Sequence, residues 1–187
     1  MLPTGFGISL PDWVQEELPP DGTIVPDLEQ RMGLVLSLAR RNIEEHSGGP
    51  FAAAVFNSSA QLIAVGLNLV ERSGCSIAHA ELVAISLAQK ALGTYRLPPG
   101  HELVVSAEPC AMCAGALPWS GIDALVSAAT DSDIRAIGFD EGNKPENWHL
   151  PLESRGIRVM SEYRREDAVN ILNRYQELGG AIYGGRP

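Results

Sequence analysis

The sequence has few cysteines and no long apolar run, and each shortage excludes a class of protein. Three cysteines in 187 residues are too few for a disulfide-stabilised scaffold. No stretch of about 18 apolar residues occurs, so we expect no membrane-spanning helix and no membrane partner. The first residues, 1–5, lack a basic segment leading into an apolar run. We therefore expect no secretory signal peptide and a cytoplasmic location.

Positive charge is also scarce. The 14 lysines and arginines are outnumbered by 23 aspartates and glutamates, which gives a formal net charge of −9 and a pI of about 4.9. The basic residues form no long run: 40–41 and 164–165 are pairs only. An acidic chain attracts the phosphates of RNA or DNA poorly. We therefore expect no nucleic-acid partner, and a small-molecule substrate rather than a polynucleotide.

The length and composition indicate one globular domain. Hydrophobic residues make up 45% of the chain and charged residues 20%, which is ordinary for a globular protein. A chain of 187 residues is long enough to bury a sizeable core. Residues 1–26 are rich in proline and glycine and are predicted to form an extended lead-in. The single domain is predicted over 27–187.

Apolar periodicity predicts alternating helices and strands. Asp27, with Gln30 as its capping-box partner, is predicted to begin a helix over 27–45. Residues 51–57 and 61–68 read as a hairpin. Further helices are predicted over 79–92, near 131–137 and near 165–178, and one more is predicted to begin at Pro109. The other strands are expected at 102–106, 123–129 and near 157–160. This order predicts an α/β fold of three layers, with helices on both faces of one sheet.

Two short motifs carry the chemistry: H-A-E at residues 79–81 and P-C-A-M-C at 109–113. Cys110 and Cys113 are three positions apart, so one helical turn places both thiolates on the same face. His79 adds an imidazole nitrogen, and zinc favours such nitrogen and sulfur ligands in tetrahedral geometry. Three protein ligands leave a fourth position open, as in catalytic rather than structural zinc sites. We therefore predict one Zn²⁺ per subunit.

Glu81 need not point at the metal, and its expected task is proton transfer. Each motif alone has a plainer interpretation: H-x-E is commonly a surface pair, and C-x-x-C can be a redox pair or half of a structural zinc site. No second C-x-x-C occurs in the chain, which weakens the structural-zinc alternative. Cys75 is the remaining cysteine; it could be a spare ligand, but we interpret it as a small buried residue.

The two motifs together resemble the H-x-E and P-C-x-x-C signature of the cytidine deaminase superfamily. The resemblance covers roughly residues 27–130, and it implies a three-layer fold around one mixed central sheet. It also implies His79, Cys110 and Cys113 as zinc ligands and Glu81 as the proton shuttle. The motifs are specific for the zinc-dependent fold and say little about which base is deaminated.

Further segments, at 48–56, 119–121, 138–142 and 145–148, are similar to bacterial guanine deaminases, particularly those that also accept the triazine ammeline. This resemblance implies hydrolysis of guanine to xanthine and ammonia. It also implies a homodimer, in which the C-terminal segment around Tyr183 acts as a lid and reaches into the neighbouring subunit's site.

The same resemblance implies substrate contacts. Asn68 occupies the position of an amide that reads the base, and an amide can both donate and accept hydrogen bonds. Phe51 and Trp119 match positions that form walls of the base pocket, where flat rings suit stacking. Glu141 is implied as a second catalytic carboxylate, which would hold a ring N–H and relay protons to the leaving ammonia. Asp140 shares that role or caps the loop.

Rival functions share the zinc residues. A deaminase acting on cytosine, cytidine, guanosine or ammeline would differ only in its pocket. A tRNA adenosine deaminase is disfavoured by the acidic composition. A zinc-binding protein without enzymatic activity is the alternative from a different class, and the intact Glu81 argues against it because a structural zinc site needs no proton shuttle.

Overall fold

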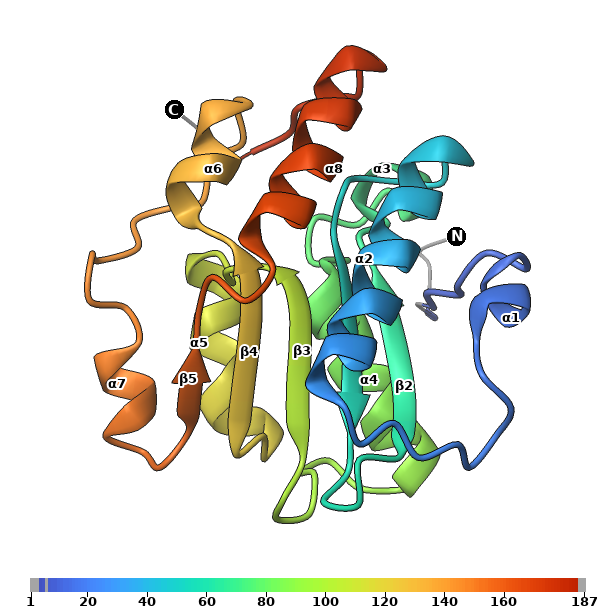
Figure 1. Ribbon diagram of the computed structural model, residues 1–187, viewed down its shortest axis with the longest axis vertical. Coiled ribbons are helices and arrows are strands. Elements are labelled where there is room, and N and C mark those ends of the chain that lie inside the picture. Colours follow the sequence, from blue (N-terminus) through green and yellow to red (C-terminus); the bar gives the residue numbers. More distant parts are fainter. Residues whose placement is uncertain (1–3, 6, 185–187) are drawn as a thin grey trace.

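A computed structural model of the protein describes residues 4, 5 and 7–184. Its centre is one mixed five-stranded sheet with the strand order β2-β1-β3-β4-β5 (Figure 1). The strands are β1 (Ala52–Phe56), β2 (Leu62–Leu67), β3 (Glu102–Ala107), β4 (Ala124–Ala129) and β5 (Arg158–Met160). Strand β1 is antiparallel to β2 and β3, whereas β3, β4 and β5 are mutually parallel. The predicted hairpin and the predicted mixed sheet are confirmed.

Helices cover both faces of this sheet, which confirms the predicted three layers. Helices α2 (Leu28–Glu44) and α8 (Arg165–Glu177) lie in front of the sheet in Figure 1, and α4 (Ala80–Leu92) and α5 (Ala111–Ser120) lie behind it. Four shorter helices, α1 (Val14–Glu17), α3 (Val70–Ser73), α6 (Asp131–Ala136) and α7 (Leu150–Glu153), complete the described chain. Among the described residues, no helix combines the length and apolar character needed to cross a membrane.

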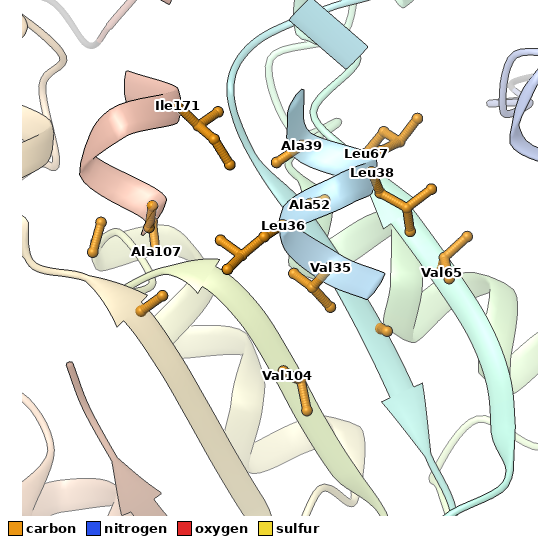
Figure 2. Close-up of a cluster of buried hydrophobic side chains, with 14 of the residues drawn as sticks. Val35, Leu36, Leu38, Ala39, Ala52, Val65, Leu67, Val104, Ala107 and Ile171 are labelled. Atoms are coloured by element: carbon orange, nitrogen blue, oxygen red, sulfur yellow. The ribbon is translucent and has the colours of Figure 1, made fainter. Parts of the chain in front are cut away.

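The two faces of the sheet build two separate cores. Successive side chains of a strand point to opposite faces, so Ala54 and Phe56 of β1 pack with α2 and α8, while Val55 packs with α4 and α5. Figure 2 shows the first core, where Leu36 of α2 and Ile171 of α8 lie over the sheet. Both faces of the central strands are buried, which explains why these strands read as continuous apolar runs.

Helix α2 begins where the sequence predicts, but its cap differs from the prediction. The Asp27 carboxylate accepts a hydrogen bond from the Glu29 backbone N–H at 2.9 Å, and the cap involves no Gln30 side chain. This bond to the residue two positions on is a local pattern that aspartate forms readily at helix starts. Asp27 therefore satisfies one free N–H of the first turn without a capping box.

The N-terminal lead-in is more structured than predicted. It contains the short helix α1, whose Val14 is fully buried. Arg41 of α2 forms ion pairs with Glu16 at 2.6 Å and Glu17 at 2.8 Å, and its guanidinium lies 5.0 Å from the Trp13 ring centroid. Proline spacing does not reveal such long-range contacts, so the sequence predicted an extended segment where the structure has a docked one.

Candidate active site

Both motifs lie at the same edge of the sheet. Strand β1 is antiparallel to both β2 and β3, so β2 and β3 run in the same direction and their carboxyl ends share an edge. His79 is the N-cap residue of α4, which follows β2, and Cys110 is the N-cap residue of α5, which follows β3. Because two helices start at this edge, His79 and Cys110 lie close together although they are about thirty positions apart in the chain.

A glycine allows α4 to approach the sheet closely at this point. A Cβ atom added to Gly66 of β2 would lie 2.1 Å from the Ala80 carbonyl oxygen and 2.4 Å from the Ala84 backbone nitrogen. Any side chain at position 66 would therefore push the first turn of α4 away from the sheet. Gly66 thus sets the position of His79 at the start of that helix.

The three predicted ligands form a cluster that fits zinc. One ligand atom from each of His79, Cys110 and Cys113 lies within 4.8 Å of the other two, and His79 Nδ1 is 3.5 Å from Cys110 Sγ. Thiolates at about 2.3 Å from one ion in tetrahedral geometry are roughly 3.8 Å apart. Zinc therefore fits between these atoms with little movement, and a fourth position remains for a small ligand.

The protonation of the thiols supports a cation between them. The hydrogen bond from Cys113 is the largest cause that lowers the pKa of Cys110, to about 4, and the His79 hydrogen bond adds to it. The same contact, together with burial, raises the pKa of the Cys113 thiol. A bound divalent cation would displace the remaining thiol proton, because metal ligation requires deprotonated thiols.

Glu81 lies in the first turn of α4, and its side chain is buried beside the cluster. Burial, reinforced by the negative charge of Cys110, raises the pKa of the Glu81 carboxyl to about 7. A carboxyl group whose pKa is close to neutral can both accept and donate a proton. The sequence prediction that Glu81 lies near the ligands agrees with this placement.

Glu141 provides a second buried carboxyl group, in the loop between α6 and α7. Burial is again the largest cause that raises its pKa, to about 8, and the charge of Cys110 adds to it. The loop is held against α5, because the Ala111 backbone N–H donates to the Glu141 carbonyl oxygen at 3.0 Å. Two buried carboxyl groups therefore face one metal cluster.

A cavity of about 450 Å³ joins these groups. It is lined by eight of the ten residues that the sequence singled out: Phe51, Asn68, His79, Glu81, Cys110, Asp140, Glu141 and Tyr183. Cys113 lies deeper, in the ligand cluster, and Trp119 lies elsewhere. The volume is in the range of small-molecule sites.

Asn68 and Asp140 differ in how they are held. Asn68 is buried at the end of β2, and its Oδ1 accepts a hydrogen bond from the Val70 backbone N–H at 3.3 Å. That bond leaves the amide NH₂ group available to a ligand. Asp140 is exposed, and its Oδ1 accepts from the Gly142 backbone N–H at 2.8 Å. Asp140 therefore stabilises the turn of the loop, which was one of its two predicted roles.

An aromatic wall closes one side of the cavity. The Phe139 ring packs edge-on against Phe51 and Tyr183, with ring centroids 5.2 Å apart in both pairs. Tyr183 thus lines the cavity of its own chain. The expectation that this segment reaches into a neighbouring subunit's site stays a prediction, because the structure describes a single chain.

Trp119 requires a correction. It does not line the cavity of its own chain, and 82% of it is exposed. Trp119 shares a face of α5 with Met112, which does line the cavity, but it lies seven residues further along the helix, roughly 10 Å away. Its resemblance to a pocket-wall position therefore does not hold within one chain.

Several lining residues were not predicted, among them Ser106, Glu108, Met112 and Phe139. Glu108 and Met112 lie within or next to the P-C-A-M-C motif, so their position beside the cysteines could have indicated them. Ser106 and Phe139 carry no such local signal. Cys75, interpreted as a buried residue, is only half-buried and belongs neither to the cluster nor to the cavity lining.

Comparisons with known proteins agree with this site. The family described as the cytidine and deoxycytidylate deaminase zinc-binding region matches residues 26–129, more than half of the chain. The chain is 38% identical to the guanine deaminase of Bacillus subtilis over 122 residues. These aligned residues make up 65% of this chain and 77% of that protein.

Two solved structures are similar over nearly the whole chain. One is the guanine deaminase from Nitrosomonas europaea, with 46% identity, a TM-score of 0.87 and coverage of 95% of this chain and 99% of the other. The second is a protein named NE0047 in complex with 2,6-diaminopurine, with 48% identity, a TM-score of 0.87 and 95% coverage of both chains. The similarity includes the C-terminal helix and the loop that carries Glu141, beyond the part matched by the family.

Proposed function

Because this chain belongs to the cytidine and deoxycytidylate deaminase family, we propose that it is a zinc-dependent aminohydrolase that converts guanine and water to xanthine and ammonia. The observation that carries the proposal is the pair of buried carboxyl groups, Glu81 and Glu141, which face one cavity together with the His-Cys-Cys cluster. The similarity to the guanine deaminases of two bacteria supports the choice of base.

Zinc held by His79, Cys110 and Cys113 would supply a Lewis acid that lowers the pKa of water at its open position. Glu81 would accept a proton from the attacking water and deliver it to the ring nitrogen next to the amine-bearing carbon. Its pKa of about 7 suits a group that takes and returns a proton within one turnover. The C–N bond would then break: the proton of the new C–O–H group would pass through a carboxyl group to the amine, which leaves as ammonia, and the C–O bond would become the carbonyl of xanthine.

Glu141 and Asn68 would orient the base. The Glu141 carboxylate can accept a hydrogen bond from a ring N–H of guanine, and in its protonated form it can give a proton to the departing amine. The free amide NH₂ of Asn68 would donate to an acceptor on the purine edge. Glu141 would thus bind a hydrogen-bond donor of the base and Asn68 an acceptor. A base must offer both groups, so the site would be more selective than the zinc cluster alone.

The aromatic wall would hold the ring and exclude water. Phe51 lines the cavity directly and is supported from behind by Phe139, so a flat base can pack against it. Tyr183, near the end of the described chain, would act as a lid residue over the same cavity. Removing water strengthens the hydrogen bonds made by the two carboxyl groups.

We propose a homodimer that uses the outer face of α5. This helix has no charged residue, and Met112, Gly115 and Trp119 are exposed at positions spaced three, four and seven apart. Exposed apolar side chains at this spacing form one continuous stripe, which is typical of an interface. Met112 also lines the cavity, so a partner on this face would lie near the mouth of the site.

A cytoplasmic location stays a prediction from the composition.

The test is ammonia release by zinc-loaded protein from guanine, guanosine, ammeline, cytosine, cytidine and adenine. We expect guanine to be turned over at least about tenfold more efficiently than guanosine, because Phe51 and Tyr183 line the cavity and suit packing against a bare base. Turnover of cytidine or guanosine instead would retain the zinc chemistry and reject the assignment of the base. Zinc retention without turnover of any of these compounds would favour a non-enzymatic zinc protein.

A further inference from the structure

Lys144 is a buried lysine that the proposed chemistry does not use. Its side chain is only 3% exposed, although lysine is almost never buried unless it is paired. Its Nζ lies 3.3 Å from Glu108 Oε2 and 3.2 Å from Asp131 Oδ1. It also donates to the Pro109 carbonyl oxygen at 3.1 Å, and it lies 5.0 Å from the centroid of the Trp148 ring.

These contacts connect three segments that meet around the cavity. Glu108 and Pro109 link β3 to α5 and immediately precede the ligand Cys110. Asp131 begins α6, and Lys144 itself belongs to the loop that carries Glu141. One ammonium group therefore ties the loop with the second carboxyl group to the segment that carries the metal ligand.

The loop around Glu141 has few other attachments of this kind. The Glu141 carbonyl oxygen accepts from Ala111, and Arg135 donates to the Gly142 carbonyl oxygen at 2.8 Å. The side chain of Arg135 is 41% exposed, so water competes for its hydrogen bonds, and surface ion pairs stabilise little. The Lys144 ammonium is the charged attachment of this loop that is shielded from water, and it acts beside the buried side chains of Phe139 and Trp148.

We propose that Lys144 is a positioning residue that holds the Glu141 carboxyl group in place against the metal site. The 3.1 Å between a Cβ added to Gly142 and Ala111 Cβ shows that the loop lies directly on α5, which supports this arrangement. Removal of the ammonium would leave Glu108 and Asp131 as two neighbouring carboxylates without their shared cation. The loop would then move away from α5, and Glu141 with it.

The inference rests on the proposed role of Glu141, and a double-mutant cycle tests it. Lys144→Met keeps the apolar length of the side chain and removes the charge. We expect it to retain zinc and to lower kcat/KM for guanine by roughly 10- to 100-fold, since displacement of a catalytic group by about 1 Å has effects of this size. The loss should appear in both KM and kcat, because Glu141 both accepts a hydrogen bond from a ring N–H of the base and passes a proton. In a Glu141→Gln background the same substitution should cost less than about threefold, because residues that act through one another are not additive.

The chain offers a matched control, since its other lysine, Lys90, is exposed on α4. Lys90→Met should keep wild-type kcat/KM. Wild-type kinetics in Lys144→Met, or an equal loss in both backgrounds, would overturn the inference, since the second result indicates general stability. If Lys144→Met does not fold, Glu108→Gln takes its place in the cycle and the same two outcomes decide. A wild-type protein that releases no ammonia from guanine would instead reject the proposed function, and the inference with it.

Discussion

The two sides of the cavity are built differently. On one side, His79, Glu81, Cys110 and Cys113 lie at the starts of two long helices. On the other side, Glu141 lies in a loop that is held by single hydrogen bonds and by one buried lysine. The side with His79, Glu81 and the two cysteines, here called the metal side, is positioned by the backbone geometry of two helix starts. The side with Glu141, here called the loop side, depends on contacts between segments that are distant in the chain. We therefore expect the two sides to respond differently to substitution.

The largest effect should come from the ligands. Cys113→Ala should abolish zinc binding and all ammonia release, because two remaining ligands cannot form a tetrahedral site with one open position. Zinc content by atomic emission, measured on the folded variant, checks the first part. A Cys113→Ala variant that keeps stoichiometric zinc and turnover would show that the ligand set is wrong.

The next effect should come from Glu81→Gln, which separates the shuttle from the metal. The variant should retain zinc and lose roughly 10²- to 10⁴-fold in kcat, since an amide cannot take the proton from water. Zinc content and steady-state kinetics measured on the same preparation provide the check. Substantial activity in this variant would refute the shuttle role.

Glu141→Gln should have a smaller effect, and it probes the loop side. An amide keeps the shape of the group but neither accepts a ring N–H with a full charge nor transfers a proton. We expect kcat/KM for guanine to fall by about 10²-fold with zinc content unchanged. Asp140→Asn is the matched control, because its amide oxygen can still accept from the Gly142 backbone N–H. Equal kinetics in wild type and Glu141→Gln would limit the chemistry to the metal side.

The smallest effect concerns the ion pair that connects α8 to α6, the helix that precedes the Glu141 loop. Arg165 forms two hydrogen bonds with Asp133 of α6, at 2.8 and 2.9 Å, and they are the main cause that holds the pKa of Asp133 well below its usual range. A lowered folded-state pKa stabilises the fold above the unfolded-state pKa of about 3.9 and loses that stabilisation as the pH falls. Arg165→Met should therefore lower the free energy of unfolding at pH 7, by an amount kept small because the Arg165 side chain is partly exposed to water.

Urea unfolding at pH 7, 4 and 3 measures this difference, which should shrink as the pH falls below about 4. Arg174→Met is the control, because the Arg174–Glu177 pair is exposed on both sides and should contribute little. A difference for Arg165→Met that stays constant down to pH 3 would show that the stabilisation comes from packing and not from the charge of Asp133.

The same contrast explains how far the sequence predicts this molecule. Helical and strand periodicity predicted the sheet, its hairpin and three of the long helices, because burial of one face leaves a local pattern, and Pro109 indicated the start of α5. The ligand cluster was predicted from spacing within two short motifs, because His79 and Cys110 lie at helix starts, where local spacing determines position. Trp119 was misplaced, because a resemblance does not show how far along α5 the cavity extends. The aromatic wall and the Lys144 contacts join segments far apart in the chain, so no local pattern reveals them.

The measurement that tests the central claim most directly is the identification of both products from guanine. Zinc-loaded protein would be incubated with guanine, and xanthine and ammonia would be quantified in the same samples by chromatography and a coupled assay. The account predicts xanthine and ammonia in a 1:1 ratio over many turnovers, with the signal lost in Glu81→Gln at unchanged zinc content. A protein with one zinc per chain that forms no xanthine would contradict it.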